Sequence, residues 1–293
     1  MPKAVAKRVP HPVKPKLGQH FLTSDSIASR LIEALGDVAQ QTVLEIGPGR
    51  GILTTPLVRR ARRVIAIELD RVLAAQLRMK FALYPNIEII EADILAIDLP
   101  ALFRPKPGLS RPGLAATHDP VRVIGNLPYY ITSDILLRLF AAREHFDSIL
   151  IMVQKEVAER LAAEPGSRDY GLLSATAQLY AKVDKLFDVP PGAFSPPPKV
   201  HSSVVRLSLD PQLERLQVAE AGFIDFLKLS FGQKRKTLWN NLRSKYPEPA
   251  LRVALHEANV KPAVRAEALP LEKSAAIYRA LASQNGNLSN TGT

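Results

Sequence analysis

The segment "LEIGPGRGILT", residues 44–54, sets three glycines directly after the apolar run "TVLEI" (42–46). The run predicts a buried strand, and Gly47, Gly49 and Gly51 follow with the spacing G-x-G-x-G. Glycines at a turn from strand to helix allow the backbone to approach a ligand closely. The third glycine is out of place for the dinucleotide fingerprint G-x-G-x-x-G, and there is no Walker A sequence. Taken alone, the loop could also be a turn with a purely structural role.

Apolar runs and helical patterns continue to alternate along the chain up to about residue 154. Segments 72–83 and 133–143 have the periodicity of helices. The predicted strands are residues 42–46, 63–69, 87–93, 121–125, 148–153 and 202–209. Strands that alternate with helices indicate an α/β fold with a parallel sheet.

The strand patterns stop after about residue 210, which predicts a second, small helical domain at 210–284. Its helical segments are residues 221–232, 236–242, 249–259 and 272–283. Residues 104–120 contain four prolines and are predicted to be a surface loop inserted into the first domain, 17–209. The polar tail, 285–293, is predicted to be disordered.

The charge balance favours a polyanionic partner. The 293 residues carry a formal net charge of +11, and nucleic acid is the commonest partner of so basic a protein. The first 16 residues contain five Lys and Arg and no acid, and residues 226–246 contain six and no acid. Residues 1–16 are therefore interpreted as a basic N-terminal arm.

The composition also argues against several classes of protein. The chain has no cysteine, which fits a reducing compartment and predicts a cytoplasmic protein. We find no secretory signal and no apolar run long enough to span a bilayer, so no membrane association is expected. The six histidines are scattered, and no metal site is expected.

Two acidic residues stand at the ends of the next predicted strands. Glu68 ends the second strand, about twenty residues after the glycine loop, where an acid can bind ribose hydroxyls. Asp93 ends the third strand, where it can accept from the adenine amino group. Each acid alone could equally be a helix cap or a solvated loop residue. Together with a loop similar to the one that holds S-adenosylmethionine in class I methyltransferases, they favour a nucleoside site at one sheet edge.

The segment "GNLPYYITS" (125–133) follows the fourth strand and suits chemistry on an adenine. The exocyclic amine of adenine is a poor nucleophile because its lone pair is delocalised into the ring. Acceptors on both N–H groups favour the pyramidal geometry, and the Asn126 side chain and the Leu127 carbonyl can provide them. Pro128 restricts the backbone there, and Tyr129 offers a face for a flipped-out base. The alternative is an ordinary Asn-Pro type of turn with core aromatics.

A resemblance to a known family rests on several motifs in order. They are "KLGQHFL" (16–22), "LEIGPGRGILT" (44–54), "GNLPYYITS" (125–133), "VQKEVAERL" (153–161), "DYGLLS" (169–174), "PPGAFSPPPKVHSSVVRL" (190–207) and "FGQKRKTLWNNL" (231–242). The combination resembles the KsgA/Dim1 family of ribosomal RNA adenine dimethyltransferases. The proline-rich segment and "KTLWNNL" are specific to this group rather than to methyltransferases at large.

The resemblance implies a class I, Rossmann-like methyltransferase domain with a seven-stranded, mostly parallel sheet, followed by a small all-α RNA-binding domain. It implies dimethylation of two adjacent adenines in a hairpin loop near the 3′ end of small-subunit (16S) rRNA. The expected cofactor is S-adenosylmethionine, without a metal. The expected partner is the rRNA of an immature ribosomal subunit, and the protein is expected to be a monomer.

The site residues are carried over motif by motif. The expected S-adenosylmethionine ligands are His20, Leu22, Gly47, Gly49, Glu68, Asp93 and Asn126. The expected catalytic residues are Asn126, Leu127, Pro128 and Tyr129. Phe194 in "AFSPPPK" is expected to hold the target adenine against Tyr129, although without the resemblance it would be interpreted as a core anchor for a proline-rich loop.

The basic C-terminal cluster is expected to bind RNA phosphates, with a solvated helix face as the alternative. Its members are Lys234, Arg235, Lys236, Arg243 and Lys245. The arm, 1–16, adds diffuse RNA affinity or is inert. Competing functions are a large-subunit rRNA methyltransferase of the macrolide-resistance type, a non-catalytic ribosome assembly factor and a DNA adenine methyltransferase.

Overall fold

The structure is a computed structural model that describes residues 20–103 and 121–288. The expected basic arm (1–16), the expected inserted loop (104–120) and the last residues of the expected tail (289–293) lie outside the described residues.

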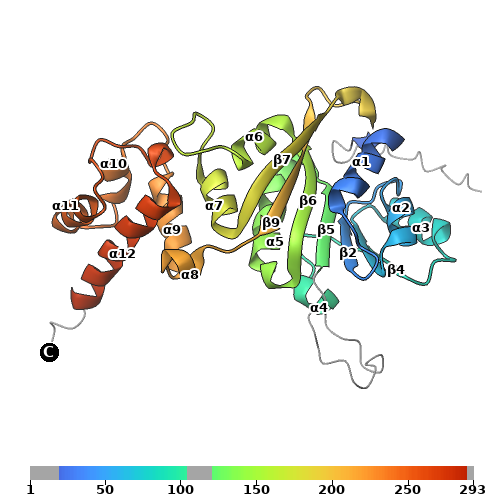
Figure 1. The fold of residues 1–293 in the computed structure, drawn as a ribbon, viewed down its shortest axis with the longest axis horizontal. Helices are drawn as coiled ribbons and strands as arrows, with labels where there is room; N and C mark the ends of the chain where they lie inside the picture. Colours follow the sequence, from blue (N-terminus) through green and yellow to red (C-terminus); the bar gives the residue numbers. More distant parts are fainter. Residues whose placement is uncertain (1–19, 104–120, 289–293) are drawn as a thin grey trace, which may run out of the picture.

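The described chain forms two sheets with helices around them (Figure 1). The strands are β1 (Phe21–Leu22), β2 (Thr42–Ile46), β3 (Arg63–Glu68), β4 (Ile87–Glu91), β5 (Val121–Asn126), β6 (Phe146–Gln154), β7 (Ala181–Val189), β8 (Phe194–Ser195) and β9 (Ser202–Leu209). The α-helices are α1 (Asp25–Leu35), α2 (Thr54–Arg60), α3 (Arg71–Lys80), α4 (Leu99–Phe103), α5 (Thr132–Ala141), α6 (Lys155–Leu161), α7 (Leu172–Tyr180), α8 (Leu213–Leu216), α9 (Glu220–Ser230), α10 (Leu238–Leu242), α11 (Glu248–Glu257) and α12 (Leu271–Leu288).

The main sheet has seven strands in the order β4-β3-β2-β5-β6-β9-β7. Strands β4, β3, β2, β5 and β6 are parallel, while β9 is antiparallel to both of its neighbours. The expected seven-stranded, mostly parallel sheet is therefore confirmed. A separate two-stranded sheet pairs β1 with β8, with Leu22 opposite Phe194.

Strand β7 was not among the strands predicted from the sequence. It lies at the edge of the sheet and carries charged side chains at Lys182, Asp184, Lys185 and Asp188. A register shift between Lys185 and Phe187 further disturbs its alternation. Charges and bulges are common on edge strands because they prevent pairing with other chains, and here they conceal the strand pattern.

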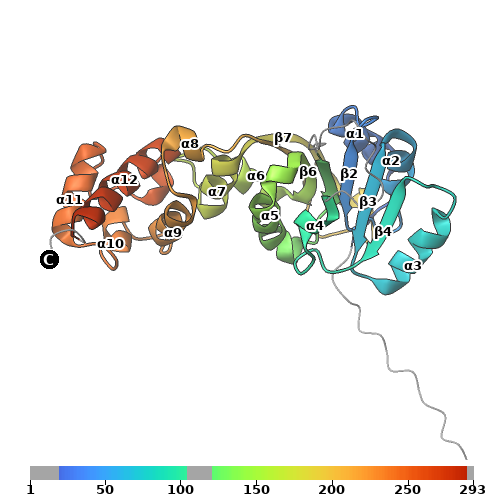
Figure 2. The same ribbon diagram turned by 90° about the horizontal axis from the view of Figure 1, so that it is seen from below.

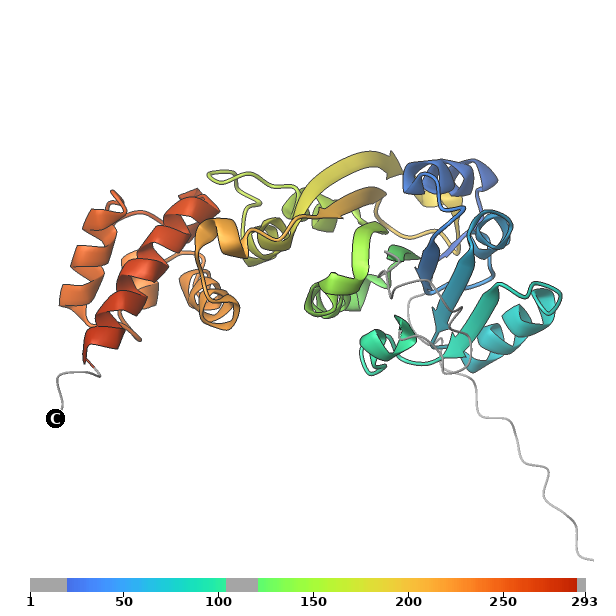
Figure 3. The ribbon, with the colours of Figure 1, turned by 60° about the horizontal axis from the view of Figure 1, so that its bottom comes forward.

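Helices cover both faces of the main sheet, as Figure 3 shows. One core contains Val43 and Val64 of the sheet with buried residues of α1, α2 and α3. The other contains Leu44 and Ile65 with residues of α5, α6 and α7. Neighbouring residues of β2 and β3 thus enter opposite cores, as successive strand residues must.

The helices from α8 to α12 form one end of an elongated molecule (Figures 1 and 2). They share a core with the sheet, since Phe223 of α9 belongs to the same buried cluster as Leu207 of β9. Arg143 donates to both carboxylate oxygens of Glu220 at 2.9 and 2.7 Å and ties α9 to the end of α5. Helix α12 continues to Leu288, past the predicted end of the helical domain at residue 284.

Candidate functional site

A cleft opens at the carboxyl edge of the parallel strands, where open α/β sheets bind ligands. It holds about 830 Å³ of space between atoms, including its open mouth. Residues from the ends of β2, β3, β4 and β5 meet there. The lining residues are His20, Phe21, Ile46, Gly47, Gly49, Ile67, Glu68, Leu69, Ala92, Asp93, Ile94, Asn126, Leu127, Pro128, Tyr129, Tyr130, Ile131 and Ile135.

The glycine loop after β2 has a backbone that only glycine adopts readily. Gly49 has a φ of 58° and Gly51 a φ of 80°, in the left-handed region that disfavours other residues. A Cβ atom on Gly49 would lie 3.0 Å from the Phe21 ring, and one on Gly51 would lie 2.9 Å from Leu77 of α3. The loop therefore packs closely against α3 on one side and leaves bare backbone at the cleft on the other.

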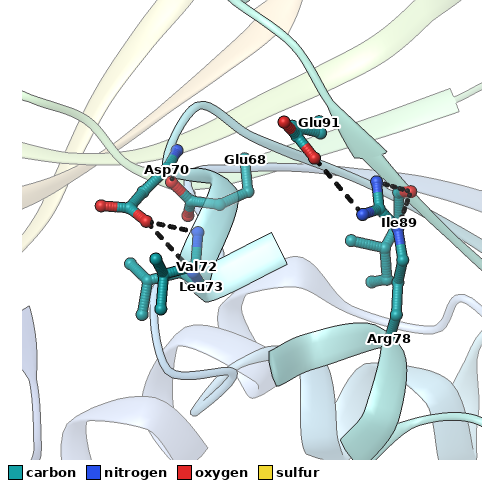
Figure 4. Close-up of polar contacts among 7 residues, drawn as sticks. All are labelled: Glu68, Asp70, Val72, Leu73, Arg78, Ile89 and Glu91. Atoms are coloured by element: carbon teal, nitrogen blue, oxygen red, sulfur yellow. Dashed lines mark hydrogen bonds and ion pairs between the residues drawn. The ribbon is translucent and has the colours of Figure 1, made fainter. Parts of the chain in front are cut away.

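Glu68 ends β3 and lies at the cleft with its carboxylate already oriented. Its Oε2 accepts from the Gly49 N–H at 3.0 Å, and its Oε1 accepts from the Asp70 N–H at 2.9 Å. The side chain is buried, and this burial raises the pKa of Glu68 while the N–H groups of Asp70 and Gly49 lower it. Figure 4 shows Glu68 beside Asp70, whose own carboxylate caps α3 by accepting from Val72 and Leu73. The acid is thus held by a capped turn.

Strand β4 ends at Glu91, earlier than predicted, so Asp93 lies two residues beyond the strand rather than at its end. Its side chain is exposed and lines the cleft, and its Oδ1 accepts from the Leu95 N–H at 2.8 Å. Arg78 of α3 holds the end of β4 by donating to Ile89 and Glu91 (Figure 4). This anchoring places Asp93 in the same cleft as Glu68.

Asn126 ends β5 and is oriented by the segment before β1. Its amide nitrogen donates to the His20 carbonyl at 3.0 Å, which leaves the side-chain oxygen available as an acceptor at the cleft. The next turn is rigid, because the Pro128 carbonyl accepts from the Ile131 N–H and the Thr132 hydroxyl. No hydrogen bond within the described residues uses the Leu127 carbonyl, so it too can serve as an acceptor.

Tyr129 is held in place at both ends of its side chain. Its hydroxyl shares a hydrogen bond of 2.8 Å with the Ser202 hydroxyl, and its ring stacks on His20 with centroids 5.7 Å apart. The His20 ring also forms a hydrogen bond through Nδ1 with the Pro196 carbonyl oxygen, which accepts. No local sequence pattern indicates this arrangement, because it depends on residues that are far apart in the chain.

The structure does not bring Leu22 or Phe194 into the cleft wall. Both are buried, at 6% and 4% exposure, in the core beneath α1. Phe194 packs as the core anchor that the sequence alone favoured. In contrast, Phe21, which the sequence did not single out, lines the cleft beneath the Arg50 guanidinium.

Glu45 lies behind the glycine loop and is fully enclosed. Its Oε2 accepts from the Thr54 hydroxyl at 2.7 Å, so that the end of β2 is joined to the first residue of α2. Burial raises the pKa of Glu45 to about 7, although the Thr54 hydrogen bond lowers it in part. The sequence contained a signal for this contact, since both residues belong to "LEIGPGRGILT".

The basic cluster, as defined above, lies in and after the turn between α9 and α10. All five side chains are exposed, and none forms an ion pair with another described residue. Lys236 and Arg243 line one surface hollow, and the Lys234 ammonium donates to the Arg168 carbonyl. Arg168 belongs to the loop after α6, which itself begins at the carboxyl end of β6. This contact joins the cluster to the loop between α6 and α7.

The described residues contain neither a metal-binding cluster nor a membrane-spanning helix. No group of three or more His, Asp or Glu side chains in residues 20–103 and 121–288 is arranged to hold a metal ion. In the same residues, no helix has both the length and the apolar character to cross a bilayer.

Solved structures share this fold over most of the chain. A dimethyladenosine transferase from Plasmodium falciparum superposes with a TM-score of 0.71 at 25% identity, over 91% of this chain and 98% of its own. The 23S rRNA methyltransferase ErmE superposes with a TM-score of 0.65 at 26% identity, over 89% and 99%.

Curated relatives are closer in sequence. "Ribosomal RNA small subunit methyltransferase A" of Koribacter versatilis is 56% identical, over 96% of this chain and 99% of its own. The protein of the same name in Acidobacterium capsulatum is 51% identical, over 92% and 91%. The family profile described as "Ribosomal RNA adenine dimethylase" matches residues 11–283. The chain therefore belongs to the ribosomal RNA adenine dimethylase family.

Proposed function

We propose that this protein transfers methyl groups from S-adenosylmethionine to the exocyclic amines of two adjacent adenines. The target is a hairpin loop near the 3′ end of small-subunit (16S) rRNA, modified during ribosome biogenesis. Membership of the family and the names of the two relatives support this substrate. The observation that carries the chemistry is the orientation of Asn126, whose nitrogen is engaged by the His20 carbonyl so that its oxygen can accept.

The residues of the cleft fit the proposed cofactor. Bare backbone at Gly47 and Gly49 can lie against the methionine portion, and the buried Glu68 carboxylate can accept from ribose hydroxyls. Asp93 can accept from the adenine amino group, and Ile67 and Ile94 offer apolar walls for the ring. When bound, the cofactor supplies an electrophilic methyl group on a sulfonium centre.

The chain contributes orientation and electrostatics rather than a strong base. The Asn126 oxygen and the Leu127 carbonyl accept from the two N–H groups of the target amine, which directs its lone pair towards the methyl group. The alkylated amine is positively charged and therefore acidic, so water can take its proton afterwards. Positioning of this kind accounts for much of the rate of such transfers.

Tyr129 provides one stacking face for the target adenine. In the structure His20 lies over this ring at 5.7 Å, whereas a base between two rings needs about 7 Å, twice a carbon contact distance. We therefore propose that the His20 ring moves aside when the base enters. Phe194 remains the proposed second face, and this role requires its buried ring to leave the core.

The remaining parts of the proposal concern the setting of the reaction. The exposed basic cluster is proposed to bind rRNA phosphates on an immature small subunit. The protein is proposed to act as a monomer in the cytoplasm, without a metal, and its lack of cysteine fits a reducing compartment.

The likeness to ErmE keeps a large-subunit substrate as the second candidate. Both purified subunits, from cells lacking this protein, are incubated with labelled S-adenosylmethionine and the protein. We expect label in adenines of the small subunit alone, and none with Asn126→Ala, which should keep its fold. Label in the large subunit would favour the second candidate. Full activity of Asn126→Ala would refute the role of this residue, and no cofactor binding by the wild type would favour a non-catalytic assembly factor.

A further inference from the structure

Tyr130 is a large aromatic side chain left open to solvent at the mouth of the cleft. Its exposure is 58%, and it is the one aromatic residue among the strongly exposed large hydrophobic residues of the described chain. It lines the same cleft as Asn126 and Tyr129. A single exposed hydrophobic side chain is ordinary on a protein surface, so it is the position of Tyr130 in the wall of this cleft that makes it a candidate contact for the substrate.

The side chains of the two neighbouring tyrosines differ in their contacts. Tyr129 has its hydroxyl bonded to Ser202 and its ring stacked on His20. Tyr130 has no hydrogen bond and no ring contact with any described residue. Its ring is thus free to receive a planar ligand, at little cost in ordering, because a tyrosine side chain has only two rotatable angles before the ring is placed.

The backbone beneath Tyr130 is fixed and turns it away from its neighbour. The segment Tyr129–Ile131 is a 3-10 turn, anchored by two hydrogen bonds to the Pro128 carbonyl. Three residues make one turn of such a helix, so successive side chains point about 120° apart. The two rings therefore cannot share one base, although their Cα atoms are about 3.8 Å apart. Two nucleotides in succession fit this pair better than one.

We propose that Tyr130 stacks against the nucleobase next to the adenine held at Asn126, so that the site has a second base-binding position. The inference rests on the proposed function, and it concerns recognition of the substrate rather than methyl transfer itself. Unpaired loops present bases that can separate in this way. Loss of one base–aromatic stack weakens binding by about 5- to 150-fold.

The test compares Tyr130→Phe, Tyr130→Leu and Tyr130→Ala on immature small subunits, with the exposed Val253→Ala of α11 as control. We expect Tyr130→Phe and the control to keep kcat/KM within about twofold of the wild type, and Tyr130→Leu to lose part of it. Tyr130→Ala should have a kcat/KM about tenfold lower than the wild type, while its cofactor Kd in calorimetry stays unchanged. Wild-type kcat/KM in Tyr130→Ala, or a cofactor Kd weakened to the same degree, would overturn the proposal.

A second measurement identifies the partner of the ring. The nucleotides on either side of the first-methylated adenine are replaced one at a time by uridine in rRNA. On one side we expect kcat/KM of the wild type to fall, and the same replacement to have no further effect with Tyr130→Ala. Independent, additive losses on both sides would show that Tyr130 contacts something else, such as a ribosomal protein. A wild type that labels no small-subunit adenine would refute the proposed function instead.

Discussion

Replacement of Glu45 by glutamine should remove a pH-dependent loss of stability. Glu45 is 1% exposed and accepts a hydrogen bond from the Thr54 hydroxyl. Its burial raises the pKa from 4.5 to about 7. Glutamine is nearly the same size and keeps an oxygen for the Thr54 hydroxyl, but it never ionises.

The sign of the effect follows from where each state binds its proton. Below about pH 4.5 Glu45 is protonated in both states and has no effect on the pH dependence of stability. Between pH 4.5 and 7 the unfolded state ionises while the folded state keeps the proton, so stability falls as pH rises. Above pH 7 both states are ionised and the loss is constant. One pKa unit corresponds to 1.36 kcal/mol, so the full loss is about 3 kcal/mol, and roughly 2.5 kcal/mol of it develops between pH 5 and 8.

Urea unfolding of the wild type and Glu45→Gln between pH 5 and 8 tests this reasoning. The difference in free energy of unfolding should shift in favour of the variant by about 2.5 kcal/mol over this range. Glu33→Gln on the exposed face of α1 serves as the control for the loss of one carboxylate. A constant difference for Glu45→Gln would refute the proposed burial of an ionisable carboxyl.

Three further substitutions test other parts of the account. Gly49→Ala places a side chain at a φ of 58° and against Phe21, so about 1 to 2 kcal/mol of strain should weaken the cofactor Kd about tenfold in calorimetry. Lys236→Ala should weaken RNA binding equally for all sequences and reduce the slope of log K against log salt by about one. Arg143→Ala loses the bidentate contact with Glu220 and should lower the free energy of unfolding by about 1 kcal/mol in urea.

Matched controls separate these effects from general damage. Gly166 also has a positive φ, but a Cβ there would meet nothing within 4 Å, so Gly166→Ala should leave cofactor affinity unchanged. Lys182 is on β7, outside the basic cluster, so Lys182→Ala should leave the slope of log K against log salt unchanged. An unaltered cofactor Kd in Gly49→Ala, or an unaltered slope in Lys236→Ala, would contradict the roles given to these residues.

The sequence predicted the positions of Glu68, Asp93 and Asn126 well, because parallel strands bring their carboxyl ends to one edge of a sheet. All three line the cleft that the fold forms there. Predictions of this kind depend only on local patterns and on the rule for strand ends. The same reasoning placed the strand ends within two residues of their observed positions.

The parts that the sequence could not predict depend on contacts between distant segments. The pairing of β1 with β8 joins residues more than 170 positions apart, and it both buries Phe194 and places His20 over Tyr129. The local pattern of "AFSPPPK" does not encode this pairing. Edge strand β7 was not predicted for a different reason, since its charged residues interrupt the alternation of apolar and polar residues that identifies a strand.

The most direct test of the account measures dimethyladenosine in small-subunit rRNA by mass spectrometry. The rRNA comes from cells that lack this protein and are complemented with the wild type or with Asn126→Ala. We predict that two adjacent dimethyladenosines are absent without the protein, return with the wild type and stay absent with Asn126→Ala. Two dimethyladenosines in the cells that lack the protein, or their return with Asn126→Ala, would contradict the central claim.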